Sequence, residues 1–354
     1  DTDTEVLDKA YDVSHDIVIV PERLVLSCLH LLNPTLIIYS DVCSEEIKNK
    51  VQKCESELGA VSVLDLSQRL LISQWNILFE KRILRDGEKL EDINKQFLLD
   101  GEKQLLLPAL YTARQYGKVD SAYNAVFNST NVFETCANLI WNQLVHHNAL
   151  MSCKGFVGTD EAEFRKMYVE GMKNAEKKTR INVVITMPGV PQRQITYGGL
   201  ASEVPNDEKK IIRLLGVHRA IAKEALLIEL PVIEKELYEK LNELEVNCIQ
   251  GTNNKYVHKA LRCIGKLLEG KFTQAQLWAI NWAKHITIFS DFPIGLAIIG
   301  NSDTSLQCYK EISYRPLSPL TRCFQNEMVK HRQIFHGAKC KIAFAECVLN
   351  DERN

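Results

Sequence analysis

The sequence predicts an α/β fold whose amino-terminal part is a parallel β-α-β-α-β unit. Short apolar runs rich in β-branched residues alternate with segments of helical spacing. Turn and stop signals separate them, since Asn33-Pro34 and Gly59 stand where the helical patterns end. Strands that alternate with helices in this order pair in parallel through right-handed crossovers. The predicted strands are residues 16–20, 35–39 and 60–64.

The two helices of this unit follow from their end signals. Residues 22–32 have helical spacing, and Pro34 disfavours helical backbone just before it. Ser44 is a good N-cap for the next helix, because its hydroxyl can accept a hydrogen bond from an early backbone N–H. Glu45 and Glu46 then place negative charge at the positive end of the helix dipole. We therefore expect a helix that starts at Ser44 and ends before Gly59.

The middle of the chain is predicted to be mostly helical. Residues 68–150 carry few strand signals, and 133–150 have the spacing of a core helix. The elements expected next are a helix at 159–178, a strand at 181–185, a loop at 187–199 with a short strand at 194–197, a helix at 206–227 and three helices between 232 and 284.

Strand patterns return near the carboxyl end. The expected elements there are strands at 286–289, 295–299 and 312–314, a helix at 318–335 and a last strand at 341–349. We therefore expect three regions, namely a parallel-sheet domain at 1–130, a helix-rich region at 131–284 with a short strand segment near 181–197, and a strand-rich region at 285–354.

Composition indicates a soluble cytoplasmic protein. Apolar residues make up 45% and charged residues 25% of the 354 residues, which is typical of globular domains. A net charge of −2 argues against electrostatic capture of nucleic acid or of an anionic membrane. No apolar run is long enough to span a bilayer. The eleven scattered cysteines favour a reducing compartment, where free thiols persist.

Two aspartates follow predicted strands and are candidate binding residues. Asp41 comes just after the second strand and Asp65 just after the third. In open α/β sheets, ligands bind beyond the carboxyl ends of the strands, so carboxylates at these positions can contact them. The alternative is that each aspartate caps the helix or turn that follows.

Three arginines are the other candidate binding residues. Arg193 lies in a loop rich in Pro and Gly that follows a strand, where the backbone can approach a ligand closely. Arg315 and Arg322 flank a bend that two prolines fix between a strand and a helix. The alternative for this bend is a rigid corner without a ligand.

Candidate catalytic and metal-binding sets are each favoured to be structural. His146 and His147 point to different sides of one helix, so they cannot readily share an ion with Cys153. The four residues of a second set lack the Cys-x-x-Cys spacing of zinc sites; they are Cys323, His331, His336 and Cys340. We expect no metal, and with neither a G-x-G-x-x-G motif nor a P-loop we expect no cofactor.

A cysteine-protease dyad within the chain is also disfavoured. His336-Gly337 could pair with Cys340 or Cys347, and a dyad needs the thiol within hydrogen-bond reach of the imidazole. Cys347, however, stands inside a predicted apolar strand, where a thiol is normally inert. We therefore assign no catalytic residue in this chain.

The segments 286–297, 312–320 and 341–354 resemble the lead-in to the peptidase core of the CHAT family. This family comprises caspase-like cysteine peptidases found largely in bacteria, and the resemblance covers residues 284–354. It implies a caspase-like α/β sheet with a His-Gly pair after one strand and a nucleophilic Cys after a later strand. His336-Gly337 follows a predicted helix, and Cys347 follows too soon for the helix that the fold needs.

The resemblance implies a function for the chain as part of a larger protein. The chain begins at Asp1 without a Met, and its last predicted strand stops close to Asn354. We therefore expect a non-catalytic regulatory or scaffold portion of a CHAT-type cysteine protease, with the catalytic His and Cys beyond Asn354. Its expected partner is a carboxyl-terminal peptidase portion or a regulatory protein, and a second copy of the chain is a further candidate.

Three other functions stay open from the residues alone. One is a self-contained α/β module that binds a small ligand or a peptide at the strand ends. Another is an α/β hydrolase whose site the sequence does not reveal. The third is a structural assembly protein with an interface at the helices that carry Trp278 and Trp282.

Overall fold

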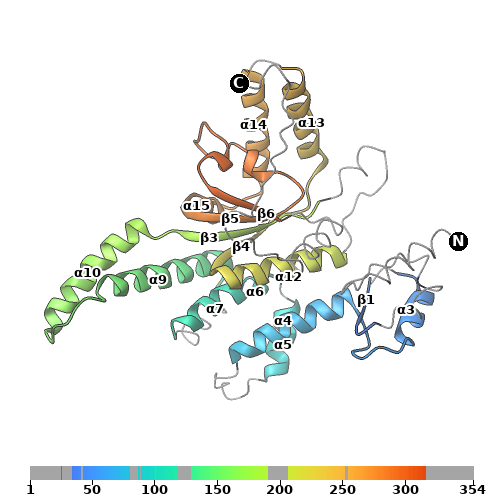
Figure 1. Ribbon diagram of the computed structural model, residues 1–354, viewed down its shortest axis with the longest axis horizontal. Coiled ribbons are helices and arrows are strands. Elements are labelled where there is room, and N and C mark those ends of the chain that lie inside the picture. The colour runs from blue at the N-terminus through green and yellow to red at the C-terminus, as the bar shows by residue number, and fades with distance from the viewer. Residues whose placement is uncertain are drawn as a thin grey trace, which may run out of the picture. The chain divides into compact units, whose positions relative to one another are not determined.

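The computed structural model of the chain describes most of it in detail (Figure 1). The described residues are 25, 34–40, 43–79, 87, 89–99, 101–117, 129–189, 206–251 and 254–315. The chain divides into two compact units, Asp1–Leu317 and Ser318–Asn354, and every described residue belongs to the first.

The centre of the first unit is a four-stranded parallel sheet in the order β4-β3-β5-β6. Its strands are β3 (Ile181–Thr186), β4 (Ala225–Glu229), β5 (Ala283–Phe289) and β6 (Glu311–Arg315). Strand β3, the first of these four in the sequence, is central, with β4 on one side and β5 on the other. The direction of winding therefore reverses between β3 and β5, and α/β folds place binding sites at the carboxyl ends of such strands.

The aliphatic side chains of strands β3, β4 and β5 are buried between the layers that cover the sheet. Val183, Val184 and Ile185 of β3 are at most 1% exposed, and β4 and β5 are also rich in buried aliphatic side chains. Parallel strands covered on both faces have this near-continuous apolar character. In contrast, β6 is half-buried or exposed and bonds to β5 alone among the described strands.

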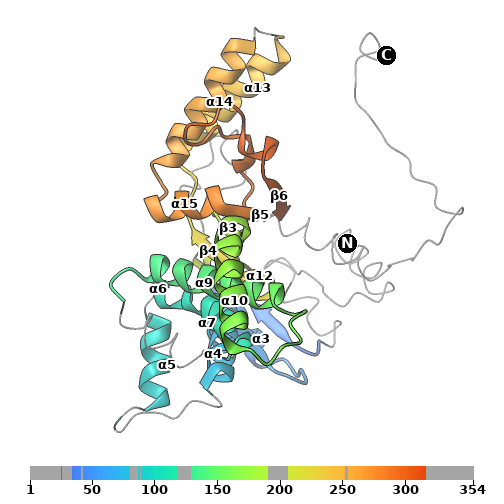
Figure 2. The ribbon, with the colours of Figure 1, turned by 90° about the vertical axis from the view of Figure 1, so that its left-hand side faces the viewer.

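Helices cover both faces of this sheet (Figures 1 and 2). One layer contains α7 (Leu106–Gln115), α9 (Val132–Ser152) and α12 (Asn206–Lys223). The opposite layer contains α13 (Lys235–Ile249), α14 (Asn254–Glu269) and α15 (Gln274–Trp282). Close approach of α12 depends on Gly216, because a Cβ there would be 2.6 Å from Cγ2 of Thr186.

A smaller parallel pair occurs earlier in the chain. Strand β1 (Ile37–Tyr39) pairs with β2 (Ala60–Ser62), and α3 (Glu45–Gln52) connects them. The backbone N of Ile47 donates to Ser44 Oγ over 3.4 Å, as the N-cap prediction required. The parallel β-α-β arrangement predicted for residues 35–64 is therefore confirmed, but the third predicted strand ends at Ser62, because Val63 and Leu64 begin the next helix. The proposed first strand at 16–20 lies outside the described residues.

The remaining helices extend the helical layers. They are α4 (Val63–Phe79), α5 (Leu90–Leu99), α6 (Gly101–Gln104) and α10 (Glu161–Lys178), with short 3₁₀ turns η2 (Ile294–Leu296) and η3 (Leu306–Cys308). Helix α10 packs against α9, α4 packs mainly against α12, and α5 packs against α6 and α4. The rings of Trp75 and Phe97 stack with centroids 4.3 Å apart, and both side chains are fully buried. This stack joins α4 to α5.

Two sequence predictions about secondary structure are wrong. The helix expected at 206–227 ends at Lys223, because Glu224 adopts a left-handed φ of 49° and the next residues form β4. The strand expected at 295–299 is replaced by η2, in which the backbone N of Gly295 donates to Tyr314 Oη over 2.8 Å. The expected elements at 194–197, 318–335 and 341–349 lie outside the described residues.

None of the helices in the described part of the chain combines the length and the apolar character that crossing a bilayer demands.

Candidate functional site

The structure describes two of the five predicted binding residues. Asp65 and Arg315 are described, whereas Asp41, Arg193 and Arg322 lie outside the described residues. The two described residues belong to different sheets, because Asp65 follows β2 and Arg315 ends β6.

Asp65 has a local structural explanation. It lies in the first turn of α4, where a carboxylate interacts favourably with the helix dipole. Its backbone N donates to Ser62 Oγ over 3.1 Å, so the strand gives way to the helix after Ser62. Its side chain is exposed. At this position the carboxylate supports the start of α4, while the capping hydroxyl comes from Ser62.

Arg315 occupies one end of a row of paired residues across the sheet. In this row Glu229 pairs with Thr186, Thr186 with Phe289, and Phe289 with Arg315. Directly paired residues of parallel strands point to the same face. Because Thr186 lies against Gly216 of α12, the row faces α12. Arg315 and Glu229 therefore lie on one face, at opposite sides of the carboxyl end of the sheet.

Arg219 of α12 lies close to Arg315. Burial lowers the pKa of the Arg219 guanidinium, and the positive charge of Arg315 lowers it further. The Arg219 Nε atom is buried and has no hydrogen-bond partner among the described residues. The two guanidinium groups, one on α12 and one on β6, are thus near enough for their charges to interact.

A histidine and a serine lie on the same face. His285 Nε2 and Ser313 Oγ are 2.8 Å apart on the adjacent strands β5 and β6. Burial lowers the pKa of His285, the carboxylate of Glu311 opposes this, and the charges of Arg219 and Lys223 add to it. A neutral imidazole beside a hydroxyl resembles a nucleophile–base pair, but no carboxylate among the described residues hydrogen-bonds to His285. The pair lacks the orienting group of a catalytic triad.

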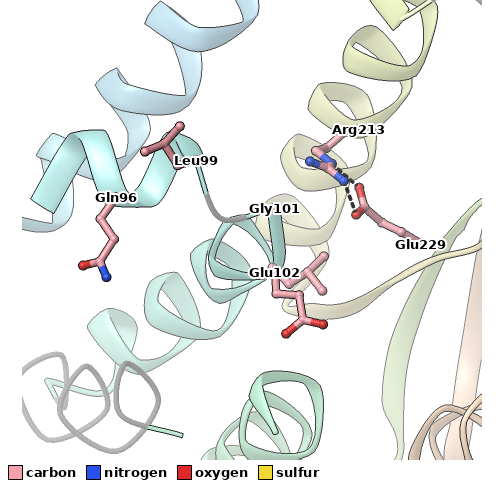
Figure 3. A pocket seen from close by; sticks show the side chains of 7 residues that line it. Gln96, Leu99, Gly101, Glu102, Arg213 and Glu229 are labelled. Atoms are coloured by element: carbon pink, nitrogen blue, oxygen red, sulfur yellow. Dashed lines mark hydrogen bonds and ion pairs between the residues drawn. The ribbon is translucent and has the colours of Figure 1, made fainter. Parts of the chain in front are cut away.

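A cavity of about 560 Å³ lies near the other end of the row (Figure 3). Its lining residues come from α5, α6, the turn after α6, α12 and β4, and are Gln96, Leu99, Gly101, Glu102, Leu105, Arg213 and Glu229. Pockets of a few hundred Å³ that combine apolar walls with a few polar groups can hold small ligands.

A two-point ion pair forms one wall of this cavity. Arg213 Nε and Nη2 donate to the two carboxylate oxygens of Glu229 over 2.6 and 2.8 Å, as Figure 3 shows. Arg213 Nη1 also donates to Gln104 Oε1 over 3.2 Å. A Cβ on Gly101 would be 3.0 Å from Nη1, so glycine gives the guanidinium room. These contacts hold Arg213 in place and join α6, α12 and β4.

The histidines and Cys153 near the end of α9 do not form one site. His146 Nδ1 lies 2.5 Å from Tyr168 Oη, whereas the ring of His147 packs against Tyr116. The thiol of Cys153 is 4.0 Å from Ser152 Oγ. The structural interpretation of these residues is therefore supported. Within the described ranges, no group of three His, Cys, Asp or Glu side chains could hold a metal ion.

Sequence reasoning missed Arg213, Arg219, His285 and Glu229. Glu229 ends a strand, which is the position that drew attention to Asp41 and Asp65. Reading residues 225–227 as part of a helix hid this signal. The proximity of Arg219 to Arg315 depends on tertiary packing and left no local sequence pattern.

Comparison of the chain with protein-family models, with curated proteins and with solved structures finds no match in any of the three.

Proposed function

We propose that the chain is a non-catalytic regulatory or scaffold portion of a caspase-like cysteine protease of the CHAT type that acts in the cytoplasm. The observation that carries this proposal is the parallel pairing of β5 with β6. These strands contain much of the segments 286–297 and 312–320 that resemble the family. Their parallel pairing agrees with the α/β sheet that the resemblance implies.

The surroundings of Cys136 and Cys308 support a non-catalytic role. Cys136 Sγ lies 3.9 Å from the carbonyl oxygen of Leu105, and Cys308 Sγ lies 3.2 Å from Ser305 Oγ. A nucleophilic thiol needs a neighbouring base or another group that stabilises the thiolate. In this proposal the catalytic His and Cys are provided by residues beyond Asn354, and the described sheet positions or regulates them.

The experiment compares the intact mass of the protein from its native host with the length of the complete gene. The proposal predicts a longer precursor, or a processed chain that co-purifies with a carboxyl-terminal fragment carrying a His-Gly pair and a Cys. A native polypeptide that ends at Asn354 and carries no peptidase fragment would overturn the proposal.

A binding module is the second candidate, and the cavity beside Arg213 and Glu229 favours it. The ligand would lie between the apolar walls from Leu99 and Leu105 and the polar wall from the ion pair. A ligand that binds only the folded state raises the melting temperature.

The test of this candidate is a thermal-shift screen with nucleotides, amino acids and short peptides. Leu99→Arg should abolish a shift caused by binding in the cavity, because Leu99 is 78% exposed and lines it. Leu58→Arg is the matched control, because Leu58 is 68% exposed and does not line the cavity. The absence of any shift, or its equal loss in both variants, would contradict the module.

A further inference from the structure

The face of β5 and β6 that is directed toward α12 gathers positive charge. Residues 311, 313 and 315 alternate with 312 and 314 along β6, so Glu311, Ser313 and Arg315 share one face. The pairing of His285 with Glu311 and of Phe289 with Arg315 places β5 residues on the same face. Arg219, on α12, contributes a third charged group to this face of the sheet.

Positive and negative charge are unequal in this cluster. Arg219, Lys223 and Arg315 are cationic, while Glu311 is the one carboxylate among the described residues of β5 and β6. Glu311 pairs with His285 at the amino end of the strands, whereas Arg315 is at the carboxyl end. Like charges that lie close together in a partly buried place are unfavourable unless an opposite charge joins them.

The unpaired N–H donor of Arg219 indicates that an anion could complete this cluster of charges. A buried N–H without a partner costs free energy, and Arg219 Nε is such a group among the described residues. Guanidinium groups bind phosphate and carboxylate groups through paired N–H donors. The two guanidiniums come from a helix and a strand and are near enough for their charges to interact, so an anion between them would be approached by donors from two elements.

We propose that Arg219, Arg315 and the hydroxyl of Ser313 form a binding site for a phosphoryl group. When Nε2 of His285 carries the proton, it donates to Ser313 Oγ across the 2.8 Å contact. The hydroxyl proton is then free to donate to a phosphoryl oxygen. His285 is a positioning residue in this arrangement, and the two arginines balance the double negative charge. The site does not depend on the caspase-like proposal, because binding is a property of the described sheet.

Titration calorimetry of the full chain with inorganic phosphate at low ionic strength tests the site. Saturable one-to-one binding is expected, and Arg219→Gln or Arg315→Gln should weaken it about tenfold or more, since each removes a charge-assisted contact. Arg315 is exposed, so its variant should keep the melting temperature of the parent chain. Ser313→Ala should weaken binding while it leaves both arginines in place.

Arg165→Gln is the matched control, since Arg165 is exposed on α10 and pairs with Glu161. Its phosphate affinity should equal that of the parent chain. No saturable binding, equal weakening in all three arginine variants, or equally tight binding of acetate would overturn the proposal. Tighter binding of a phosphoserine peptide than of phosphate would identify a phosphorylated side chain as the source, and equal binding would identify free phosphate.

Discussion

Glu229 and Arg315 lie at opposite ends of one row of side chains across the carboxyl end of the four-stranded sheet. Helix α12 places an arginine near each of them, because Arg213 pairs with Glu229 and Arg219 lies close to Arg315. Arg213 is neutralised by the carboxylate of Glu229, whereas Arg219 lies near the positive charge of Arg315. The same helix thus carries an ion-paired arginine on one side of the sheet and, on the other, an arginine of the proposed phosphoryl site.

Glu229→Gln should destabilise the fold by about 1–2 kcal/mol, because it removes the charge from a two-point ion pair. Both side chains are partly shielded, with 27% of Arg213 and 22% of Glu229 exposed. Urea unfolding measures the change. Glu161→Gln breaks the ion pair of the 84% exposed Glu161 and should cost no more than about 0.5 kcal/mol. Equal effects of the two substitutions would contradict a structural role for the Arg213–Glu229 pair.

Gly265→Ala should destabilise the protein by about 2–3 kcal/mol, because a Cβ there would overlap the carbonyl group of Ile298. The backbone at Ile298 must then move away from α14. Gly270→Ala is the control, since its Cβ would make only ordinary contacts, the nearest 3.7 Å away. Chemical unfolding of both variants checks this, and an unchanged Gly265→Ala protein would show that the close packing of α14 is not maintained in solution.

Stability should fall at alkaline pH in part through Tyr238. Burial raises the pKa of Tyr238 to about 12, and the negative charge of Asp291 adds to this effect. The raised value means that the folded state holds the proton more tightly than the unfolded chain does. The contribution of Tyr238 is complete below about pH 10, the usual tyrosine pKa, and is lost as the pH rises toward 12.

Tyr238→Phe removes this ionisation and should make the free energy of unfolding depend less steeply on pH between 10 and 12. Unfolding in urea at several pH values measures the slope. A variant with the same slope as the parent chain would show that Tyr238 does not carry the effect.

The cysteines should differ widely in reactivity. Cys136 is 2% exposed, and burial raises the pKa of its thiol to about 12, so almost none of it is thiolate at pH 8. Cys248 is exposed near the end of α13. Iodoacetamide under native conditions should modify Cys248 well before Cys136 and leave Cys136 intact until the protein unfolds. Mass spectrometry measures the rate of modification at each thiol. Equal rates at Cys248 and Cys136 would contradict the packing of α9.

Local signals predicted much of the secondary structure. The hydroxyl of Ser44 caps α3, and Asp160 caps α10 by accepting from Ala162 N over 2.8 Å. In each of these hydrogen bonds the donor and the acceptor are only two or three residues apart, so the local sequence predicts the bond. Helical spacing located α9, and short β-branched runs located β3 and β5.

The pairings between distant residues could not be predicted in this way. Residues 225–227 have the apolar character of either a helix or a buried strand, so β4 was assigned to the preceding helix. With β4 hidden, the position of Glu229 at a strand end was hidden too. The electrostatic interaction between Arg219 and Arg315 joins residues almost a hundred positions apart and depends on how α12 lies against the sheet.

The most direct test of the proposed function is labelling with a thiol-reactive peptide probe, applied to the product of the complete gene and to this chain alone. The account predicts one labelled cysteine in the complete product, outside these 354 residues, with labelling suppressed by a competing peptide substrate. It predicts no such labelling of the isolated chain. Specific, competed labelling of one of the eleven cysteines of this chain would contradict a non-catalytic role.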